Sequence, residues 1–274
     1  LSLGYRGEQV TTDTSRSFGF ASNAPGALTK QLLPFADQQI DGFTSSLRLS
    51  LTWDNRDNRI FPTRGFYTSL SAQFADENLG SENEFQRYRY FGRFYQPVIA
   101  GLVLKLNTEG GLIWSQNDKG VPLYERFFMG GIMSVRGFPL QSVGPHVAAP
   151  SQLDPVATGR ARGVAIGGNA MLRYNLELEL PVAESVGIRA VLFTDGGNSW
   201  NMEDKWCQAG PAPSRDGAED PCTGIDPLDL RKSWGVGFRW FSPLGPLRFE
   251  LGLPFKPRSY EETYRFEFTI GNFF

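Results

Sequence analysis

The sequence contains one histidine and two cysteines among 274 residues, which removes most of the side chains that enzymes use. A serine or cysteine hydrolase needs a histidine beside its nucleophile, and the single histidine, His146, follows Pro145 in a loop-like segment. No Gly-x-Ser-x-Gly elbow and no phosphate-binding glycine loop occurs. Two sulfurs without a nearby histidine make a poor metal site. We therefore expect no enzyme activity, no cofactor and no bound metal.

Long apolar runs and an excess of positive charge are also missing. No stretch approaches the roughly 18 apolar residues of a transmembrane helix, and no basic segment precedes an apolar one, so we expect no signal peptide within these residues. The formal net charge is −2, which offers no broad basic surface to nucleic acid. A mean hydropathy of −0.29 suits a soluble protein, but membrane barrels share it because polar residues face their lumen.

Alternation of polar and apolar residues dominates what is present. The apolar residues of segment 170–181 fall at every second position: Leu172, Tyr174, Leu176, Leu178 and Leu180. A strand collects them on one face, whereas a helix would scatter them around its axis. We expect apolar residues of this kind to face lipid: Leu172, Tyr174, Leu176, Phe238, Trp240, Phe249 and Phe266. The opposite face of these strands should line a lumen, with Lys105, Glu109, Arg173, Glu177 and Arg248.

Ten segments are predicted strands: 1–8, 43–53, 65–76, 85–96, 102–114, 169–180, 188–200, 233–242, 247–254 and 263–274. Strands of about 9–11 residues cross a bilayer when tilted. Their connections alternate between short and long, and aromatic residues gather near strand ends, as in outer-membrane barrels. A soluble β-sandwich with a polar outer face is the alternative. We favour an all-β fold, a transmembrane antiparallel β-barrel. Because the first strand begins at residue 1 with no lead-in, we expect part of a larger barrel.

A motif at residues 128–138 places Arg136 among glycines and apolar residues, within a connection of about fifty residues, 116–168. Connections of this length are usually functional. If the loop folds into the lumen, the arginine needs a carboxylate with matching fork geometry. Glu177 and Asp195 lie on the polar faces of the next two strands, and Phe193 lies on the same face as Asp195. The alternative is a solvated arginine and two ordinary lumen carboxylates.

Several motifs together resemble the BamA family of outer-membrane assembly proteins. The loop motif is Val135, Arg136, Gly137 and Phe138; Glu177, Phe193 and Asp195 resemble the strands whose acids hold that arginine; segments 58–65, 242–247 and 254–255 resemble family turns. The family fold is a sixteen-stranded barrel preceded by periplasmic POTRA domains. The resemblance implies that residues 1–274 are the C-terminal part of the barrel, its last ten strands, without the first six strands and the POTRA domains.

The resemblance also implies a function. Proteins of this family accept unfolded outer-membrane proteins and insert them into the bilayer, templating client strands at the edge between the first and last barrel strands, with no covalent chemistry. It implies unfolded outer-membrane clients, accessory assembly lipoproteins and outer-membrane lipid as partners, no nucleic acid, and an integral location in the bacterial outer membrane. A related polypeptide translocator, of the TamA or two-partner secretion type, and a passive pore are the alternatives.

Two further features concern the C-terminal third. Tyr264, Phe266, Phe268, Ile270 and the terminal Phe274 resemble the β-signal of outer-membrane barrels, and the strand that carries them would form half of the gate. Cys207 and Cys222 lie in one loop rich in glycine, proline and aspartate. We predict that they form a disulfide on the external, oxidising side of the membrane.

Overall fold

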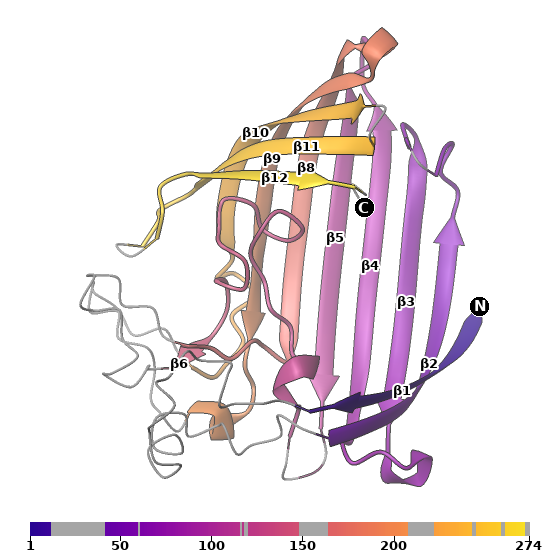
Figure 1. Cartoon of the computed structure of the whole chain (residues 1–274), viewed down its shortest axis with the longest axis vertical. Coiled ribbons are helices and arrows are strands. Elements are labelled where there is room, and N and C mark those ends of the chain that lie inside the picture. Colours follow the sequence, from indigo (N-terminus) through magenta and orange to yellow (C-terminus); the bar gives the residue numbers. More distant parts are fainter. Residues whose placement is uncertain are drawn as a thin grey trace.

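The computed structural model describes residues 1–11, 42–59, 61–115, 117, 120–147, 164–207, 222–242, 245–258 and 261–271. Ten strands form one antiparallel sheet in the order β1-β2-β3-β4-β5-β8-β9-β10-β11-β12 (Figure 1). They are β1 (Ser2–Val10), β2 (Gly42–Asp54), β3 (Gly65–Ala75), β4 (Phe85–Pro97), β5 (Val103–Trp114), β8 (Ala170–Ala183), β9 (Ile188–Trp200), β10 (Arg231–Ser242), β11 (Gly245–Pro254) and β12 (Arg265–Ile270). Each pairs with its neighbour along the chain, as hairpins do.

Short elements fill some of the connections. β6 (His146–Val147) and β7 (Val164–Ala165) make a small separate sheet. The 3₁₀ turns are η1 (Glu77–Leu79), η2 (Leu123–Glu125), η4 (Glu184–Val186) and η5 (Asp204–Cys207). His146, which the sequence placed in a loop-like segment, lies in β6 opposite Ala165 of β7 and is half-buried.

No helix in the described part of the chain is long and apolar enough to span a membrane.

All ten predicted strands are confirmed, and a single sheet excludes the sandwich alternative. Six of the ten strands are longer than the predicted 9–11 residues, up to 14 in β8. The last strand is shorter than predicted. β12 has six residues, so Tyr264 lies just before it, and Phe274 lies outside the described residues.

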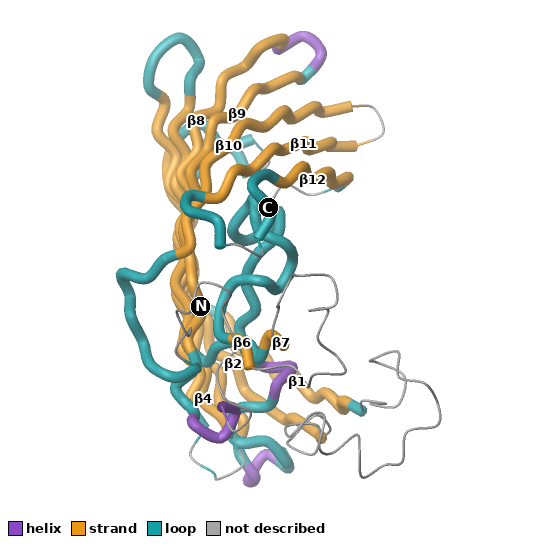
Figure 2. The backbone as a smooth tube through the Cα atoms, turned by 90° about the vertical axis from the view of Figure 1, so that its left-hand side faces the viewer, coloured by secondary structure: helices purple, strands orange, loops and turns teal. Residues whose placement is uncertain are grey.

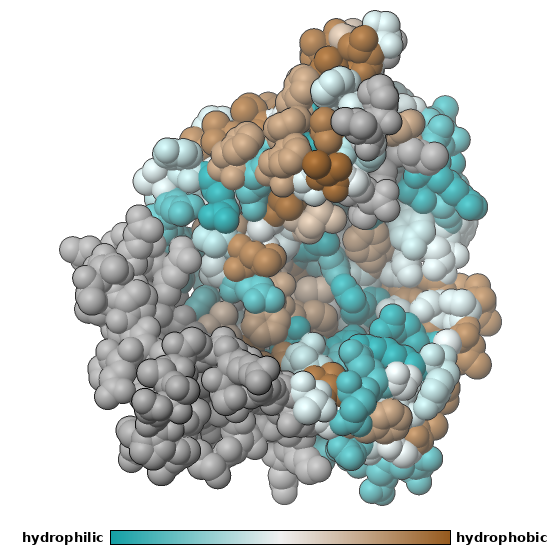
Figure 3. Space-filling view, viewed as in Figure 1, coloured by the Kyte–Doolittle hydropathy of each residue, from teal (hydrophilic) through white to brown (hydrophobic). Residues whose placement is uncertain are grey.

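The two faces of the sheet differ as the alternation predicts. Leu172 and Phe266 on the outer face are 40% and 61% exposed, whereas Glu177 and Asp195 on the inner face are 4% and 0% exposed. Hydrophilic side chains occupy the hollow at the centre of the concave side (Figure 3). Apolar groups therefore cover the outside and ion pairs fill the inside, which is the arrangement of a membrane barrel and the reverse of a soluble protein.

The sheet curls strongly around the segment that joins β5 to β8, which lies on its concave side in both views (Figures 1 and 2). Among the described residues β1 and β12 pair with one neighbour each, so the sheet is open rather than closed. The short connections meet at one end of the sheet and the long ones at the other. At the short-turn end, Phe61 of the β2–β3 turn packs edge-on against Phe241 of β10, with ring centroids 4.3 Å apart.

Candidate functional site: an arginine-centred ion network in the lumen

The loop between β5 and β8 forms a tight excursion that carries Arg136 to the inner wall of the sheet. Its two limbs are joined where the Gly131 amide donates to the Phe138 carbonyl at 2.8 Å. Gly130 and Gly137 have φ of +110° and +85°, a region that only glycine occupies without strain. The glycines of the motif therefore serve the reversal of the chain, and Arg136 lies just before the second of them.

The guanidinium of Arg136 makes four charge-assisted hydrogen bonds, all to carboxylates. Nε and Nη2 donate to the two carboxylate oxygens of Asp195, each at 2.6 Å. Nη1 donates to Glu177 at 2.6 Å and to Glu250 at 2.9 Å. The backbone amide of Arg136 donates to Asp195 at 3.0 Å. The Arg136 side chain is 1% exposed and that of Asp195 0% exposed, so the bidentate pair is dry and its geometry is close to ideal.

The guanidinium also lies against an aromatic face. Its central carbon is 3.6 Å from the centroid of the Phe193 ring, a cation–π contact that is strengthened by the absence of water. The ring fits because residue 235 on the next strand is glycine. A Cβ on Gly235 would lie 2.5 Å from the Phe193 ring carbon Cζ. Phe193 is thus held between Arg136 and a strand that has no side chain at that point.

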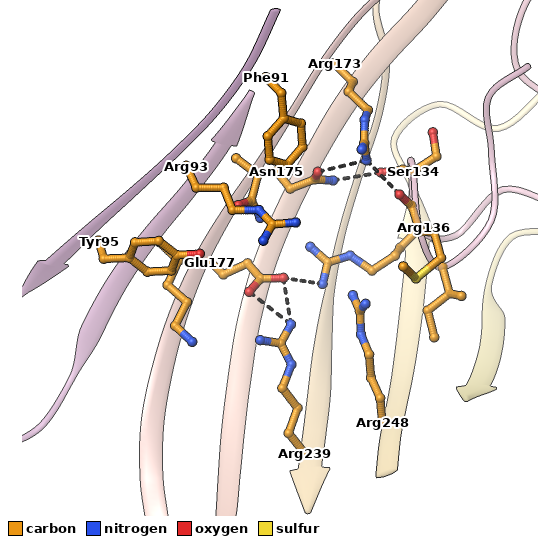
Figure 4. Close-up of a pocket in the computed structure, with 14 residues that line it drawn as sticks. Phe91, Arg93, Tyr95, Ser134, Arg136, Arg173, Asn175, Glu177, Arg239 and Arg248 are labelled. Atoms are coloured by element: carbon orange, nitrogen blue, oxygen red, sulfur yellow. Dashed lines mark hydrogen bonds and ion pairs between the residues drawn. The ribbon is translucent and has the colours of Figure 1, made fainter. Parts of the chain in front are cut away.

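A second arginine, Arg239 on β10, extends the network toward the short-turn end. It donates to Glu177 at 2.8 Å, to Glu179 at 3.0 Å and to Glu250 at 3.3 Å. Lys105 on β5 donates to Glu179 at 2.7 Å. Figure 4 shows Arg136 and Arg239 approaching Glu177 from two sides. Further members at the edge are Arg189, which binds Glu179, and Arg248, which binds Glu250.

The network brings together four predicted residues, Arg136, Glu177, Phe193 and Asp195, and adds members that the sequence reasoning missed. Glu250 and Arg239 were not among the residues expected to contact Arg136. Alternation placed both on the inner face, and that was the available signal. It could not show that β11, more than fifty residues after Asp195, curls back onto the same loop.

The flanking residues of the motif fix the loop to the wall through backbone and apolar contacts. Val135 and Phe138 are buried in a cluster with Met129 and Phe127. A Cβ on Gly252 of β11 would lie 2.5 Å from the backbone nitrogen of Gly137. The motif glycine and the strand glycine therefore touch backbone to backbone, and neither position has room for a side chain.

The loop has a second anchor near the long-loop end, at Arg126. Its guanidinium donates to the Ile166 and Gly167 carbonyls at 2.8 and 2.9 Å and to Glu203 at 3.0 Å. Burial lowers the pKa of Arg126 to about 10, against the opposing effect of Glu203. The side chain also lies over the ring of Trp206. This anchor was not foreseen. Two of its four acceptors are backbone carbonyls, which carry no sequence signal, and the other two are the side chains of Glu203 and Asn201.

The predicted disulfide lies beside this second anchor. Cys207 and Cys222 are joined, and the Asn201 side chain donates to the Cys222 carbonyl at 3.1 Å. The bridge therefore fixes the start of the β9–β10 connection on the end of the sheet that carries the long loops. Most of that connection lies outside the described residues.

The C-terminal strand carries its aromatic side chains on the outer face. Phe266, Phe268 and Ile270 are exposed, and Tyr264 just before the strand is 64% exposed. Phe268 packs against Phe249 of β11, with ring centroids 4.8 Å apart. Of the predicted β-signal, four residues are thus described and lie where lipid would contact them. The signal role itself stays a prediction.

Comparison with known proteins places the chain in one family. Residues 1–274 match the Omp85 superfamily domain. The outer membrane protein assembly factor BamA of Nitratidesulfovibrio vulgaris is 28% identical over 242 residues, 87% of this chain and 26% of that protein. BamA of Neisseria meningitidis is 29% identical over 227 residues, 80% of this chain and 27% of that protein. A SAM50-like protein of Drosophila melanogaster is 33% identical over 125 residues, 44% of this chain and 28% of that protein.

Two solved structures extend the comparison. A crystal structure of BamA from Haemophilus ducreyi lacking POTRA domains 1–3 has a TM-score of 0.69 at 25% identity, covering 98% of this chain and 49% of that one. CdiB from Acinetobacter baumannii shares the fold, with a TM-score of 0.52 at 14% identity, covering 84% of this chain and 33% of that one. The chain spans about a quarter of the length of the BamA proteins it matches in sequence. The resemblance to BamA is confirmed over most of the chain, and the chain belongs to the Omp85 superfamily.

Proposed function

We propose that this chain is the C-terminal part of the barrel of an outer-membrane insertase, which folds client β-barrel proteins and inserts them into the bilayer. The observation that carries the proposal is the lumen loop. Two arginine-centred anchors, at Arg136 and Arg126, hold it against the inner wall, and both arginine side chains are buried. A loop held this rigidly would help the barrel to keep its shape while the edge between its first and last strands opens.

The mechanism needs no covalent step. An edge strand presents a row of unpaired N–H and C=O groups, and in hydrocarbon each unpaired group costs several kcal/mol. An unfolded client that supplies a complementary strand satisfies these groups, so pairing is strongly favoured. β12, whose outward residues are Phe266, Phe268 and Ile270, would form one half of that edge. We place the long-loop end, with its disulfide, outside the cell and the short turns in the periplasm.

The partners and the location follow from the same proposal. The clients are unfolded outer-membrane proteins that arrive from the periplasm, and accessory lipoproteins assist. The host membrane is the bacterial outer membrane, since two relatives that cover 87% and 80% of this chain are bacterial assembly factors. The complete protein would carry POTRA domains and six further strands ahead of these ten.

Two other functions are weaker fits. A passive pore gains nothing from a loop fixed across its lumen by buried ion pairs. A translocator of the two-partner secretion type shares the fold, but the similarity to CdiB is lower in both identity and TM-score than the similarity to BamA.

The test is a folding assay with the full-length protein in liposomes. An unfolded client barrel is added, and its folding is followed by heat-modifiable gel mobility. The expected result is faster client folding than in liposomes that hold an unrelated barrel at the same density. Unchanged client folding together with a steady single-channel conductance would replace the proposal with a passive pore.

A further inference from the structure

A cavity of about 180 Å³ lies at the long-loop end of the sheet, beyond the point where β9 and β10 stop pairing. Its walls come from the lumen loop at 142–145, the end of β9 at 198–201, the segment 223–231 that leads into β10, and the β11–β12 connection at 258 and 261. A single water needs roughly 10–15 Å³ of such space, so the cavity has room for a ligand the size of one sugar ring. We refer to it as the β9 cavity.

Hydrogen bonds between these segments hold the walls of the β9 cavity in place. The Gly224 amide donates to the Asn201 carbonyl at 2.9 Å, and the Asn201 side chain donates to the carbonyl of Cys222, a disulfide residue, at 3.1 Å. The Asn198 side chain donates to the Asp229 carbonyl at 2.7 Å. A ligand would therefore meet walls that are ordered before it binds, which lowers the entropic cost of binding.

Two buried polar groups in the wall have no hydrogen-bond partner among the described residues. They are the Ser199 hydroxyl and the indole Nε1–H of Trp200, and their residues are 2% and 8% exposed. Both residues line the β9 cavity. A buried polar group without a partner is destabilising, and a ligand group that pairs with it removes that penalty. This side of the cavity therefore asks for a ligand that can accept a hydrogen bond from an indole.

Two carboxylates line the solvent-exposed side of the same cavity. Asp226 and Asp229 are exposed, and in the described part of the chain neither forms an ion pair. One oxygen of the Asp226 carboxylate accepts from the Leu228 amide at 3.0 Å, which orients the group. An ionised carboxylate accepts hydrogen bonds and cannot donate them. This side of the cavity therefore asks for a ligand that donates.

Hydroxyl groups meet both requirements. The Trp200 indole only donates, so neither a metal ion nor an ammonium group can pair with it, and Asp226 and Asp229 repel a phosphate or a carboxylate. No cluster of three residues able to hold a metal ion occurs in the described ranges. A backbone amide has one donor and one acceptor, whereas a sugar ring carries several hydroxyls that each do both.

We propose that the β9 cavity is a saccharide-binding site, in which one sugar ring lies between the Trp200 indole and the carboxylates of Asp226 and Asp229. The saccharide is either free or linked to a lipid. The site depends on the cavity and not on the folding of client proteins, so it can fail while the proposed function holds.

The test uses the full-length protein labelled with fluorotryptophan, in a zwitterionic detergent that has no sugar headgroup. The probes are the methyl glycosides of glucose, galactose and mannose, followed by intact lipopolysaccharide and the oligosaccharide released from it, which separate a lipid-linked source from a free one. We expect a saturable shift of the Trp200 fluorine resonance, which is assigned by its loss in Trp200→Phe. A Trp200 resonance that moves with none of these probes overturns the proposal, as does one that moves only with an acetylated peptide.

Two variants locate the binding. Asp229→Asn should weaken the affinity about tenfold, because it removes a charged acceptor, and Ser199→Ala should weaken it severalfold. Asp204→Asn is the matched control, since Asp204 is exposed in η5 and does not line the cavity. Heat-modifiable mobility checks that each variant is folded. If folded Asp229→Asn and Ser199→Ala both bind the probe as tightly as Asp204→Asn does, the saccharide binds elsewhere and the proposal is wrong.

Discussion

Removing the side chain of Arg136 should destabilise the barrel more than any other single loss of charge in the lumen. In the described part of the chain, every hydrogen bond to the Asp195 carboxylate comes from Arg136. Arg136→Ala leaves Asp195 with one backbone N–H, at a site with no access to water. Glu177 and Glu250 suffer less because each keeps Arg239. A buried charge left without its partner costs roughly 3–5 kcal/mol, which is the loss we expect in the free energy of unfolding.

The measurement is urea-induced unfolding in phospholipid micelles, followed by tryptophan fluorescence. Arg136→Lys should fall between the parent and Arg136→Ala, because lysine keeps the charge but lacks the planar fork that binds both oxygens. Arg173→Ala is the matched control. Arg173 also faces the lumen and donates to a loop carbonyl, that of Met133, but its acid, Glu109, retains Arg89. The control should therefore lose only about 1 kcal/mol.

A double-mutant cycle decides whether Arg136 and Asp195 act as a pair. Asp195→Asn alone leaves Arg136 with Glu177 and Glu250. Adding Asp195→Asn to Arg136→Ala should lower the free energy of unfolding little further, because it removes the carboxylate charge that Arg136→Ala leaves unpaired. We expect the effects to be strongly non-additive. If the two losses add to within about 0.5 kcal/mol, the residues are energetically independent. That result would refute the role of the Arg136–Asp195 ion pair in holding the loop, as would an Arg136→Ala protein no less stable than the Arg173→Ala control.

Two further predictions concern the contact points of the loop and the turn. Gly252→Ala should lower the free energy of unfolding by about 1–3 kcal/mol through overpacking and make the lumen loop sensitive to protease, because the new Cβ would lie 2.5 Å from the backbone of Gly137. The control is Gly4→Ala, where a Cβ meets nothing within 4 Å, and it should change neither the stability nor the protease sensitivity. In the β2–β3 turn, loss of solvent around Asp57 is outweighed by hydrogen bonds from the Thr63 hydroxyl and nearby amides, which lower the pKa of its carboxyl to about 2. A depressed pKa stabilises the turn above the ordinary value near 4. Protection of the Thr63 amide from hydrogen exchange should therefore decline as pH falls from about 4 to 2, and it should be lost at all pH values in Asp57→Ala, which removes the acceptor.

The period of the sequence determined most of the fold. A side-chain repeat of two residues is a property of the extended backbone itself, so Leu172 and Glu177 could be assigned to opposite faces without knowing what either touches. The rhythm of short and long connections likewise reports hairpin topology, because antiparallel neighbours are joined directly. Strand ends were less certain, and β12 is shorter than its pattern of alternating aromatics suggested.

The sequence also reached part of the candidate site, through the motif around Arg136. The length of the connection 116–168 and the glycines of the motif were consistent with a segment that folds inward. The polar faces of β8 and β9 supplied Glu177 and Asp195 as candidate carboxylate partners for Arg136. These two strands pair directly, with Glu177 opposite Phe193, so adjacency along the chain made their proximity predictable.

Only the tertiary structure decided the rest. Glu250 and Arg239 join the network because the sheet curls until β10 and β11 reach the loop, and curvature depends on twist summed over many strands rather than on any local pattern. Arg126 binds backbone carbonyls, which every residue possesses. The spaces that admit the Phe193 ring at Gly235 and the Gly137 backbone at Gly252 are marked in the sequence only by a residue without a side chain. Local periodicity thus fixed which way each residue faces, whereas the partner it meets across the lumen depends on the path of the whole sheet.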